Sequence, residues 1–278
     1  MTYLDQMSFT TLRIRYADGE RVNFGTGFFL SNGFLSKDKR KINTLYLVTC
    51  KHVIENNKNA QIFVLLKCVD DQGESVNFPF FVTPQWFFHP TEDLCMANFS
   101  GIPGYLRLKN HLYFAGIPFS KNTIMEAKDL AGLETNEEVS LIGYPVGIID
   151  DVNNFPLIRK GTTAYKPAID FQGEQGKYAK LKVGVVDMPV SRGSSGSPII
   201  ITNSESLYRA YGLRPEKPTV SLLGIAFETS YDFSQVFDEK TKENLGNYSV
   251  RDYVDIGYYI KSEELLEMIQ DAESIFFK

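Results

Sequence analysis

The stretch VSRGSSGSPII, residues 190–200, decides how this sequence is interpreted. Its centre, residues 193–197, consists only of glycine and serine. One interpretation is a turn that joins two strands. The other is a loop that holds Ser195 as a nucleophile, because glycines allow successive backbone N–H groups to turn toward one point. In that case the N–H groups of Gly193 and Ser195 would stabilise the oxyanion that forms during attack.

A serine hydroxyl needs a neighbouring base, so the positions of the histidines are informative. The sequence has only three histidines: His52, His89 and His111. All precede Ser195, which excludes the Ser–acid–His order of α/β-hydrolases. The subtilisin order, Asp–His–Ser, stays formally open with Asp18 or Asp38 as the acid, although no motif surrounds either residue. The remaining order is His–Asp–Ser.

His52 and Asp93 are the candidates for the other two positions. His52 follows a strand-like run in LVTCKHVI, residues 47–54, and Asp93 precedes an apolar run in DLCMA, residues 93–97. A carboxylate bound to the far nitrogen of an imidazole sets its tautomer and stabilises the imidazolium formed in the reaction. His89 and His111 are interpreted as surface or hydrogen-bonded structural histidines.

These stretches, in this order, resemble the chymotrypsin-like serine peptidases, in the trypsin-like branch that includes the bacterial HtrA-type peptidases. Four further stretches share the resemblance: GTGFFL (25–30), LIGYPVG (141–147), LLGIAFE (222–228) and DIGYYIKSEELLEMI (255–269). The resemblance implies an all-β fold of two packed six-stranded antiparallel β-barrels with a C-terminal α-helix. It implies one domain over residues 1–278, with barrels at about 1–118 and 119–260 and a helix at 262–274. In a departure from the HtrA-type pattern, we expect no PDZ domain after this helix.

The resemblance also implies roles for individual residues. His52 would act as general base and then acid, Asp93 would orient it, and Ser195 would form the acyl-enzyme. The residues implied for substrate binding are Pro189, Arg192, Phe227, Glu228 and Thr229. Because no acid stands at position 189, we expect a small or medium apolar side chain, not Arg or Lys, before the scissile bond. The implied function is a serine endopeptidase acting on protein or peptide; the alternative is a catalytically silent protein-binding module.

Composition restricts the other classes of function. The apolar fraction of 43% and the charged fraction of 23% are typical of soluble globular proteins. A net charge of −5 argues against nucleic acid or an anionic membrane as partner. The start of the chain lacks a secretory signal, and Cys50, Cys68 and Cys95 lack metal-ligand spacing. We therefore expect a cytoplasmic protein with free thiols and no metal or cofactor; the resemblance implies a bacterial protein, and the oligomeric state is not indicated.

Local patterns predict several elements. Alternation in TLRIRY, residues 11–16, and the turn residues Asp18 and Gly19 predict a hairpin with residues 21–30. A short helix is expected at residues 205–213. The C-terminal helix should be capped by Ser262 and bury one stripe of apolar residues: Leu265, Met268, Ile269 and Ala272. Residues 101–135, 147–176 and 229–253 are expected to be long loops.

Overall fold

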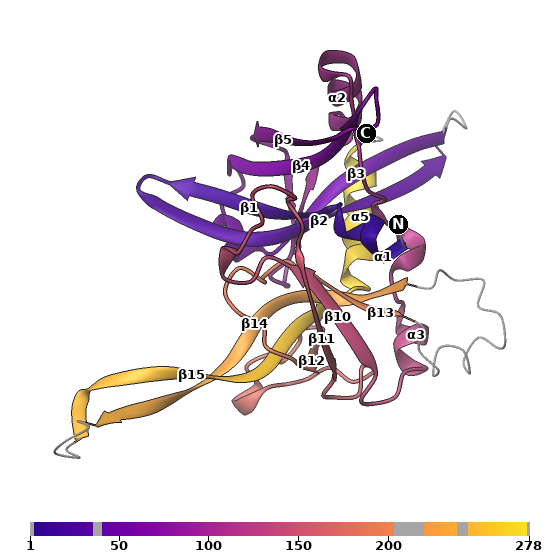
Figure 1. The fold of residues 1–278 in the computed structure, drawn as a ribbon. Helices are drawn as coiled ribbons and strands as arrows, with labels where there is room; N and C mark the ends of the chain where they lie inside the picture. The colour runs from indigo at the N-terminus through magenta and orange to yellow at the C-terminus, as the bar shows by residue number, and fades with distance from the viewer. Residues whose placement is uncertain (1–2, 36–40, 203–219, 238–243, 277–278) are drawn as a thin grey trace.

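The computed structural model describes residues 3–35, 41–202, 220–237 and 244–276, and its β-strands form two sheets, one from each half of the chain (Figure 1). The predicted helix at residues 205–213 lies outside the described residues. In the described part, no helix has the length and apolar composition needed to cross a bilayer.

The first half forms a nine-stranded sheet in which β5-β4-β1-β2-β3-β7-β6 are neighbours in that order. Its strands are β1 (Thr11–Asp18), β2 (Arg21–Leu35), β3 (Lys41–Thr49), β4 (Ile62–Asp70), β5 (Ser75–Val82), β6 (Trp86–Phe88), β7 (Cys95–Asn98), β8 (Leu112–Phe114) and β9 (Phe119–Ser120). The predicted β1–β2 hairpin is confirmed, with Asp18 opposite Arg21. The described strands of this sheet do not close into a barrel, whereas the sequence analysis expected a six-stranded barrel here.

The second half forms a closed antiparallel barrel in the order β10-β11-β12-β15-β14-β13. Its six strands are β10 (Glu138–Gly143), β11 (Leu157–Thr163), β12 (Val183–Asp187), β13 (Pro198–Thr202), β14 (Val220–Phe237) and β15 (Asn244–Lys261). The predicted β-rich architecture with a six-stranded barrel and a C-terminal helix is confirmed. It is consistent with the chymotrypsin-like fold expected from the motifs.

Short helices occupy the connections. They are α1 (Tyr3–Ser8), η1 (Lys51–Ile54), α2 (Ile102–Asn110), η2 (Lys121–Thr123), α3 (Ala127–Ala131), η3 (Pro145–Gly147) and η4 (Glu174–Gly176). The expectation of long loops is wrong for much of their length. Residues 101–135 contain α2 and α3, residues 147–176 contain β11, and most of residues 229–253 continues β14 and β15 as a hairpin. The hairpin extends well beyond the barrel (Figure 1).

The C-terminal helix α5 (Glu264–Phe276) joins the two halves. Its predicted apolar stripe is confirmed: Leu265, Met268, Ile269 and Ala272 are all buried, in the same hydrophobic core as the strands of the first sheet. Ser262 does not cap the helix through its side chain; its hydroxyl instead donates to the Met125 carbonyl at 3.2 Å. The helix follows the second barrel in sequence but packs on the first sheet, so it holds the halves together.

Candidate active site

His52 is presented by the turn that ends β3. The strand stops at Thr49, and η1 follows with Val53 and Ile54 buried, while the His52 side chain is 44% exposed. Gly25 makes this packing feasible, because a Cβ there would lie 2.5 Å from the Val53 methyl groups. The Asn23 amide also donates to the carbonyl of His52 at 3.2 Å. The buried half of the turn therefore fixes its backbone and leaves the imidazole at the surface.

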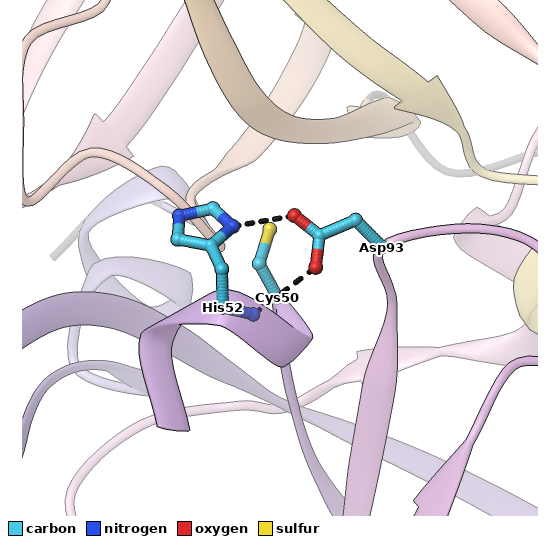
Figure 2. Close-up of side chains that lie close together, drawn as sticks. All are labelled: Cys50, His52 and Asp93. Atoms are coloured by element: carbon cyan, nitrogen blue, oxygen red, sulfur yellow. Dashed lines mark hydrogen bonds and ion pairs between the residues drawn. The ribbon is translucent and has the colours of Figure 1, made fainter. Parts of the chain in front are cut away.

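Asp93 lies between β6 and β7, and its carboxylate binds His52 twice (Figure 2). Asp93 Oδ1 accepts the backbone N–H of His52 at 3.1 Å, and Oδ2 is hydrogen-bonded to His52 Nδ1. A carboxylate can only accept here, so Nδ1 carries a proton, and in the neutral imidazole Nε2 keeps its lone pair. The two residues selected from the sequence are therefore brought together in the tautomer that a general base requires.

Cys50 lies beside this pair (Figure 2). Its Sγ, a His52 ring nitrogen and an Asp93 carboxylate oxygen all lie within 4.8 Å of one another, close enough to bind a metal ion. Burial, followed by the negative charge of Asp93, raises the pKa of the Cys50 thiol well above its usual value. A metal needs a thiolate, whereas this group stays protonated and donates to the Ala226 carbonyl at 3.4 Å. The chemistry of the set thus favours the hydrogen-bonded His–Asp pair over a metal centre.

The serine loop packs directly against the strands that precede His52. Gly196 has φ +87°, and a Cβ there would lie 2.0 Å from the Thr26 carbonyl oxygen and 2.5 Å from Thr49 Oγ1. The carbonyl of Ser195 accepts the Thr26 N–H at 2.9 Å. Only glycine permits this approach, and it places Ser195 beside the end of β3 from which His52 projects.

The Ser195 hydroxyl does not bind His52 in this structure. It donates to the Phe227 carbonyl on β14 at 3.3 Å, and among the described residues no hydrogen bond joins it to His52. Its neighbours in the loop are different: Ser194 and Ser197 are fully buried, whereas Ser195 is partly exposed. Of the three serines, Ser195 is thus the one that a substrate could reach.

The predicted oxyanion donors, Gly193 and Ser195, have free amides. The carbonyl of Arg192 accepts the Val146 N–H at 2.5 Å, and the carbonyl of Ser194 accepts the Ser197 N–H at 2.9 Å. In a trans peptide the N–H points away from the C=O, so the amides of Gly193 and Ser195 face away from these contacts. Within the described chain neither amide donates to a protein acceptor. Two unpaired amides two residues apart are what an oxyanion hole requires.

Val146 supports the backbone of the candidate oxyanion loop, and the sequence analysis missed it. It has φ +55° and is 70% exposed, which is rare for a β-branched residue. Its N–H holds the Arg192 carbonyl, and the adjacent turn leaves no room for a side chain at position 193, where a Cβ would lie 2.5 Å from the Tyr144 oxygen. The LIGYPVG motif was noted in the sequence, but no local signal shows that its backbone supports the oxyanion loop.

We expect Val146→Gly to be about 1 kcal/mol more stable than a Val→Gly change at an unstrained exposed position, because relief of the positive φ offsets the entropy that glycine adds to the unfolded chain. Urea unfolding monitored by tryptophan fluorescence measures the change. Val152→Gly is the matched control, since Val152 is 80% exposed and has no positive φ. If both variants lose the same stability, Val146 is not strained.

The predicted substrate-binding residues lie in two adjoining cavities. One, of about 270 Å³, is lined by Val190, Ser191, Arg192, Ser195, Phe227, Glu228, Thr229 and Tyr231. The other, of about 170 Å³, is lined by Pro189, Val190, Ser191, Thr229 and Asp255. Tyr231 and Asp255 were not selected from the sequence, because irregular pairing of β14 with β15 brings them here.

The charge of Glu228 at this cavity is compensated. Its carboxylate forms an ion pair with Lys177 and accepts the Tyr178 hydroxyl at 2.9 Å. Arg192 is exposed at the rim, and Asp255 is exposed in the neighbouring cavity. The cavity beside Ser195 is therefore lined by the apolar Val190 and Phe227, by neutral polar groups, by the compensated Glu228 and by the charged Arg192.

Two buried residues hold the loop that carries Asp93. His89 Nδ1 accepts the Glu92 N–H at 2.9 Å, so Nε2 carries the proton, and it faces Glu264 Oε2 at 3.2 Å. Glu92 Oε1 accepts the Lys182 N–H at 3.0 Å. His89, Glu264 and Glu267 lie close enough for a metal, but a metal at Nε2 would need the lone pair that the proton occupies. His89 is confirmed as a hydrogen-bonded structural histidine.

Glu92 leads to a prediction about pH. Burial, with a further contribution from Glu264, raises the pKa of the Glu92 carboxyl. A raised pKa in the folded state means that its contribution to stability is lost as pH rises through that pKa. Glu92→Gln keeps the acceptor for Lys182 without the buried charge, so its stability relative to wild type should increase from pH 5 to pH 8. A difference in unfolding free energy that does not change with pH would contradict this.

Comparisons with known proteins give only distant similarities. The sequence matches no protein-family model and no curated protein. The HtrA-type protease AlgW, solved with a tripeptide, has 16% identity and a TM-score of 0.49, covering 98% of this chain and 63% of its own. The Rv3671c protease from M. tuberculosis in its active form has 16% identity and a TM-score of 0.48, and the match covers 95% of this chain and 81% of that protease. An inactivated protease paralogue from the scabies mite has 14% identity and a TM-score of 0.48, and the match covers 97% of this chain and 96% of the paralogue.

This chain therefore spans less than two thirds of the length of the AlgW chain.

Proposed function

We propose that this protein is a serine endopeptidase in which Ser195 is the nucleophile, His52 the general base and Asp93 the orienting carboxylate. The observation that carries the proposal is the double contact between Asp93 and His52, through Nδ1 and through the backbone N–H. It leaves Nε2 with its lone pair on a partly exposed ring, next to the loop that carries the exposed serine.

The reaction follows from these positions. His52 Nε2 takes the Ser195 proton as Oγ attacks the peptide carbonyl, and the amides of Gly193 and Ser195 stabilise the oxyanion. The protonated His52 then gives its proton to the leaving amine, which leaves an acyl-enzyme on Ser195. A water molecule, deprotonated by His52, attacks this ester and releases the acid and the serine. The Asp93 carboxylate stabilises the imidazolium in both halves of the cycle.

One rearrangement must precede the first step. The Ser195 hydroxyl has to leave the Phe227 carbonyl and turn toward Nε2 of His52. Catalytic hydrogen bonds of this kind often form only when substrate is bound. A contact of 3.3 Å is longer than the usual range for a hydroxyl donor, so little is lost when it breaks.

The substrate we propose is an exposed segment of a protein or peptide with a small or medium apolar residue before the scissile bond. The apolar walls of Val190 and Phe227 and the compensated charge of Glu228 support this preference. Asp255 is the group that could shift it toward basic residues, since it is an exposed acid in the adjoining cavity.

The second candidate function is a non-catalytic protein-binding module. The observation that favours it is the Ser195 hydroxyl, which is bonded to Phe227 and not to His52. Labelling with a fluorophosphonate probe separates the two, because the probe reacts only with an activated serine hydroxyl. We expect labelling at Ser195, identified by peptide mapping, and none after His52→Ala. A folded protein that stays unlabelled, alone and with unfolded protein added, would favour the binding module.

A further inference from the structure

Thr26 is a fully buried residue of β2 whose side chain contacts the loop that carries Ser195. Its Oγ1 donates a hydrogen bond to the carbonyl of Gly193 at 2.8 Å. The same oxygen accepts the backbone N–H of Tyr144 at 3.0 Å. A hydroxyl has one proton to donate and two lone pairs that can accept, so both contacts can exist at once. One side chain of the first half of the chain therefore binds two segments of the second half.

The contact with Thr26 fixes the peptide plane that follows Gly193. This plane contains the Gly193 carbonyl and the Ser194 N–H. The N–H donates to the Ser191 carbonyl at 3.0 Å, which lies in the same loop. Among the described residues, the Thr26 hydroxyl is the only group that donates to the Gly193 carbonyl. It is therefore the contact that ties this plane to a segment outside the loop.

This plane matters because Gly193 can rotate. Gly193 has φ +85° and no side chain, so its backbone has more freedom than that of any other residue type. The plane before Gly193 is fixed where the Val146 N–H donates to the Arg192 carbonyl, and the plane after it is fixed by Thr26. The free amides of Gly193 and Ser195 lie on either side of this point. Their common direction therefore depends on the Thr26 hydroxyl.

The backbone of Thr26 is itself held between the two parts of the site. Its N–H donates to the Ser195 carbonyl at 2.9 Å, and its carbonyl accepts the Thr49 hydroxyl at 2.7 Å. Thr49 is the last residue of β3, directly before the turn that presents His52. Thr26 thus lies between the His52 turn and the nucleophile, and its hydroxyl sets the oxyanion donors relative to both.

Few other side chains could make both contacts at position 26. Strands favour β-branched residues, and valine has the shape of threonine but can neither donate nor accept a hydrogen bond. The space around Oγ1 is tight, since a Cβ at Gly143 would lie 3.0 Å from it. Substitution by valine therefore removes the hydroxyl while it keeps the volume, and substitution by serine keeps the hydroxyl.

We propose that Thr26 is the positioning residue of the oxyanion hole: its hydroxyl holds the Gly193 carbonyl so that the amides of Gly193 and Ser195 point to one site. The inference rests on the proposed function, because it assigns Thr26 a part in stabilising the oxyanion of the peptidase reaction. Since Thr26 is fully buried, it does not touch the substrate. Its effect belongs to the chemical step, in which the oxyanion forms, and not to substrate binding.

Steady-state kinetics of Thr26 variants test this role. The substrate is the tetrapeptide coumarin amide that wild type cleaves fastest in a library of such peptides. We expect Thr26→Val to lower kcat by about 10-fold to 100-fold and to leave KM within about 2-fold, because misdirected amides weaken only the contact with the oxyanion. Thr26→Ser keeps the donor and the acceptor, so it should recover at least about half of the wild-type kcat.

Thr44→Val is the matched control. Thr44 is also buried, and its Oγ1 donates to the Asn32 carbonyl at 3.1 Å, away from the candidate site. The change removes the same atom from the same sheet, so it reports the effect of losing a buried hydroxyl on stability alone. We expect its kcat to stay within about 2-fold of wild type. Equal losses in Thr44→Val and Thr26→Val would overturn the inference.

A pair of inhibitors gives a readout that a purely structural role would not move. One is the aldehyde of the chosen tetrapeptide, and the other is the matching alcohol. Ser195 Oγ adds to the aldehyde carbon while its proton passes to His52, and the carbonyl oxygen becomes an oxyanion beside the two amides. The alcohol binds without this step. We expect Thr26→Val to weaken the aldehyde by the factor by which kcat falls, and the alcohol by less than about 2-fold. Equal weakening of both inhibitors, or of neither, contradicts the proposal.

Thr26→Ala keeps the test open if the valine variant does not fold. Valine leaves the Gly193 carbonyl and the Tyr144 N–H without a partner, whereas alanine leaves room for a water molecule to bind both. We expect the same pattern of losses, because a water is fixed less rigidly than a side chain. A wild type that cleaves peptides no better than these variants overturns the inference and leaves the peptidase intact. A wild type that cleaves no peptide and is not labelled by the fluorophosphonate overturns the proposed function and this inference with it.

Discussion

Ser195→Ala is expected to abolish peptide-bond hydrolysis and fluorophosphonate labelling, with a loss in kcat of at least about 10³-fold to 10⁴-fold. Alanine removes the hydroxyl of Ser195, the only one of Ser194, Ser195 and Ser197 that is not fully buried, in the loop that packs against the end of β3. Release of a fluorescent peptide, followed under single-turnover conditions, measures the loss. The fold should survive, because the hydroxyl makes a single hydrogen bond, to Phe227 at 3.3 Å.

Ser197→Ala is the matched control for this variant. Ser197 belongs to the same loop, and its hydroxyl is fully buried without a hydrogen-bond partner among the described residues. Its removal should leave hydrolysis within about 2-fold of wild type, because surface and core changes away from the reacting atoms act mainly on stability. Equal activity of wild type and Ser195→Ala would show that a different residue is the nucleophile.

Asp93→Asn is expected to reduce kcat by about 10⁴-fold, the size known for this change in Ser-His-Asp triads. The asparagine oxygen can still accept the backbone N–H of His52, whereas its NH₂ group donates to Nδ1. Nε2 then carries the proton and can no longer accept one from Ser195. Both contacts are retained, so the structure should persist while the tautomer becomes wrong for catalysis.

Asp151→Asn is the control for the same chemical change at an exposed position outside the site. It should leave kcat unchanged. NMR of the imidazole nitrogens gives an independent readout, because the tautomer of His52 should change in Asp93→Asn alone. Retention of the Nδ1–H tautomer together with full activity would mean that Asp93 does not orient the base.

Much of the candidate site could be predicted from the sequence because the chemistry restricts the choice of residues. With three histidines, all before Ser195, few residue orders remained, and the structure places His52 and Asp93 in direct contact. The apolar stripe of α5 was equally predictable, because helical periodicity is local. The predicted side-chain cap by Ser262 was wrong. The hydroxyl of Ser262 bonds instead to Met125, 137 residues away in the sequence, and local patterns do not reveal such a contact.

The substrate region shows where local patterns stop. The segment 229–253 has many polar residues and was expected to be a loop, whereas its pairing across the hairpin makes it a ribbon. Asp255 and Tyr231 reach the cavities only because the register of β14 against β15 shifts between Thr229 and Tyr231. A shift in register leaves no mark in residue composition.

By itself the sequence determined which chemical groups are present, their order along the chain and the β-rich character of the fold, because these depend on residue type and short-range periodicity. Only the tertiary structure decided which way the amides of Gly193 and Ser195 point, that Val146 holds the Arg192 carbonyl, and that the Ser195 hydroxyl rests on Phe227. Those directions depend on backbone contacts between segments far apart in sequence, and any residue except proline supplies the same backbone donor.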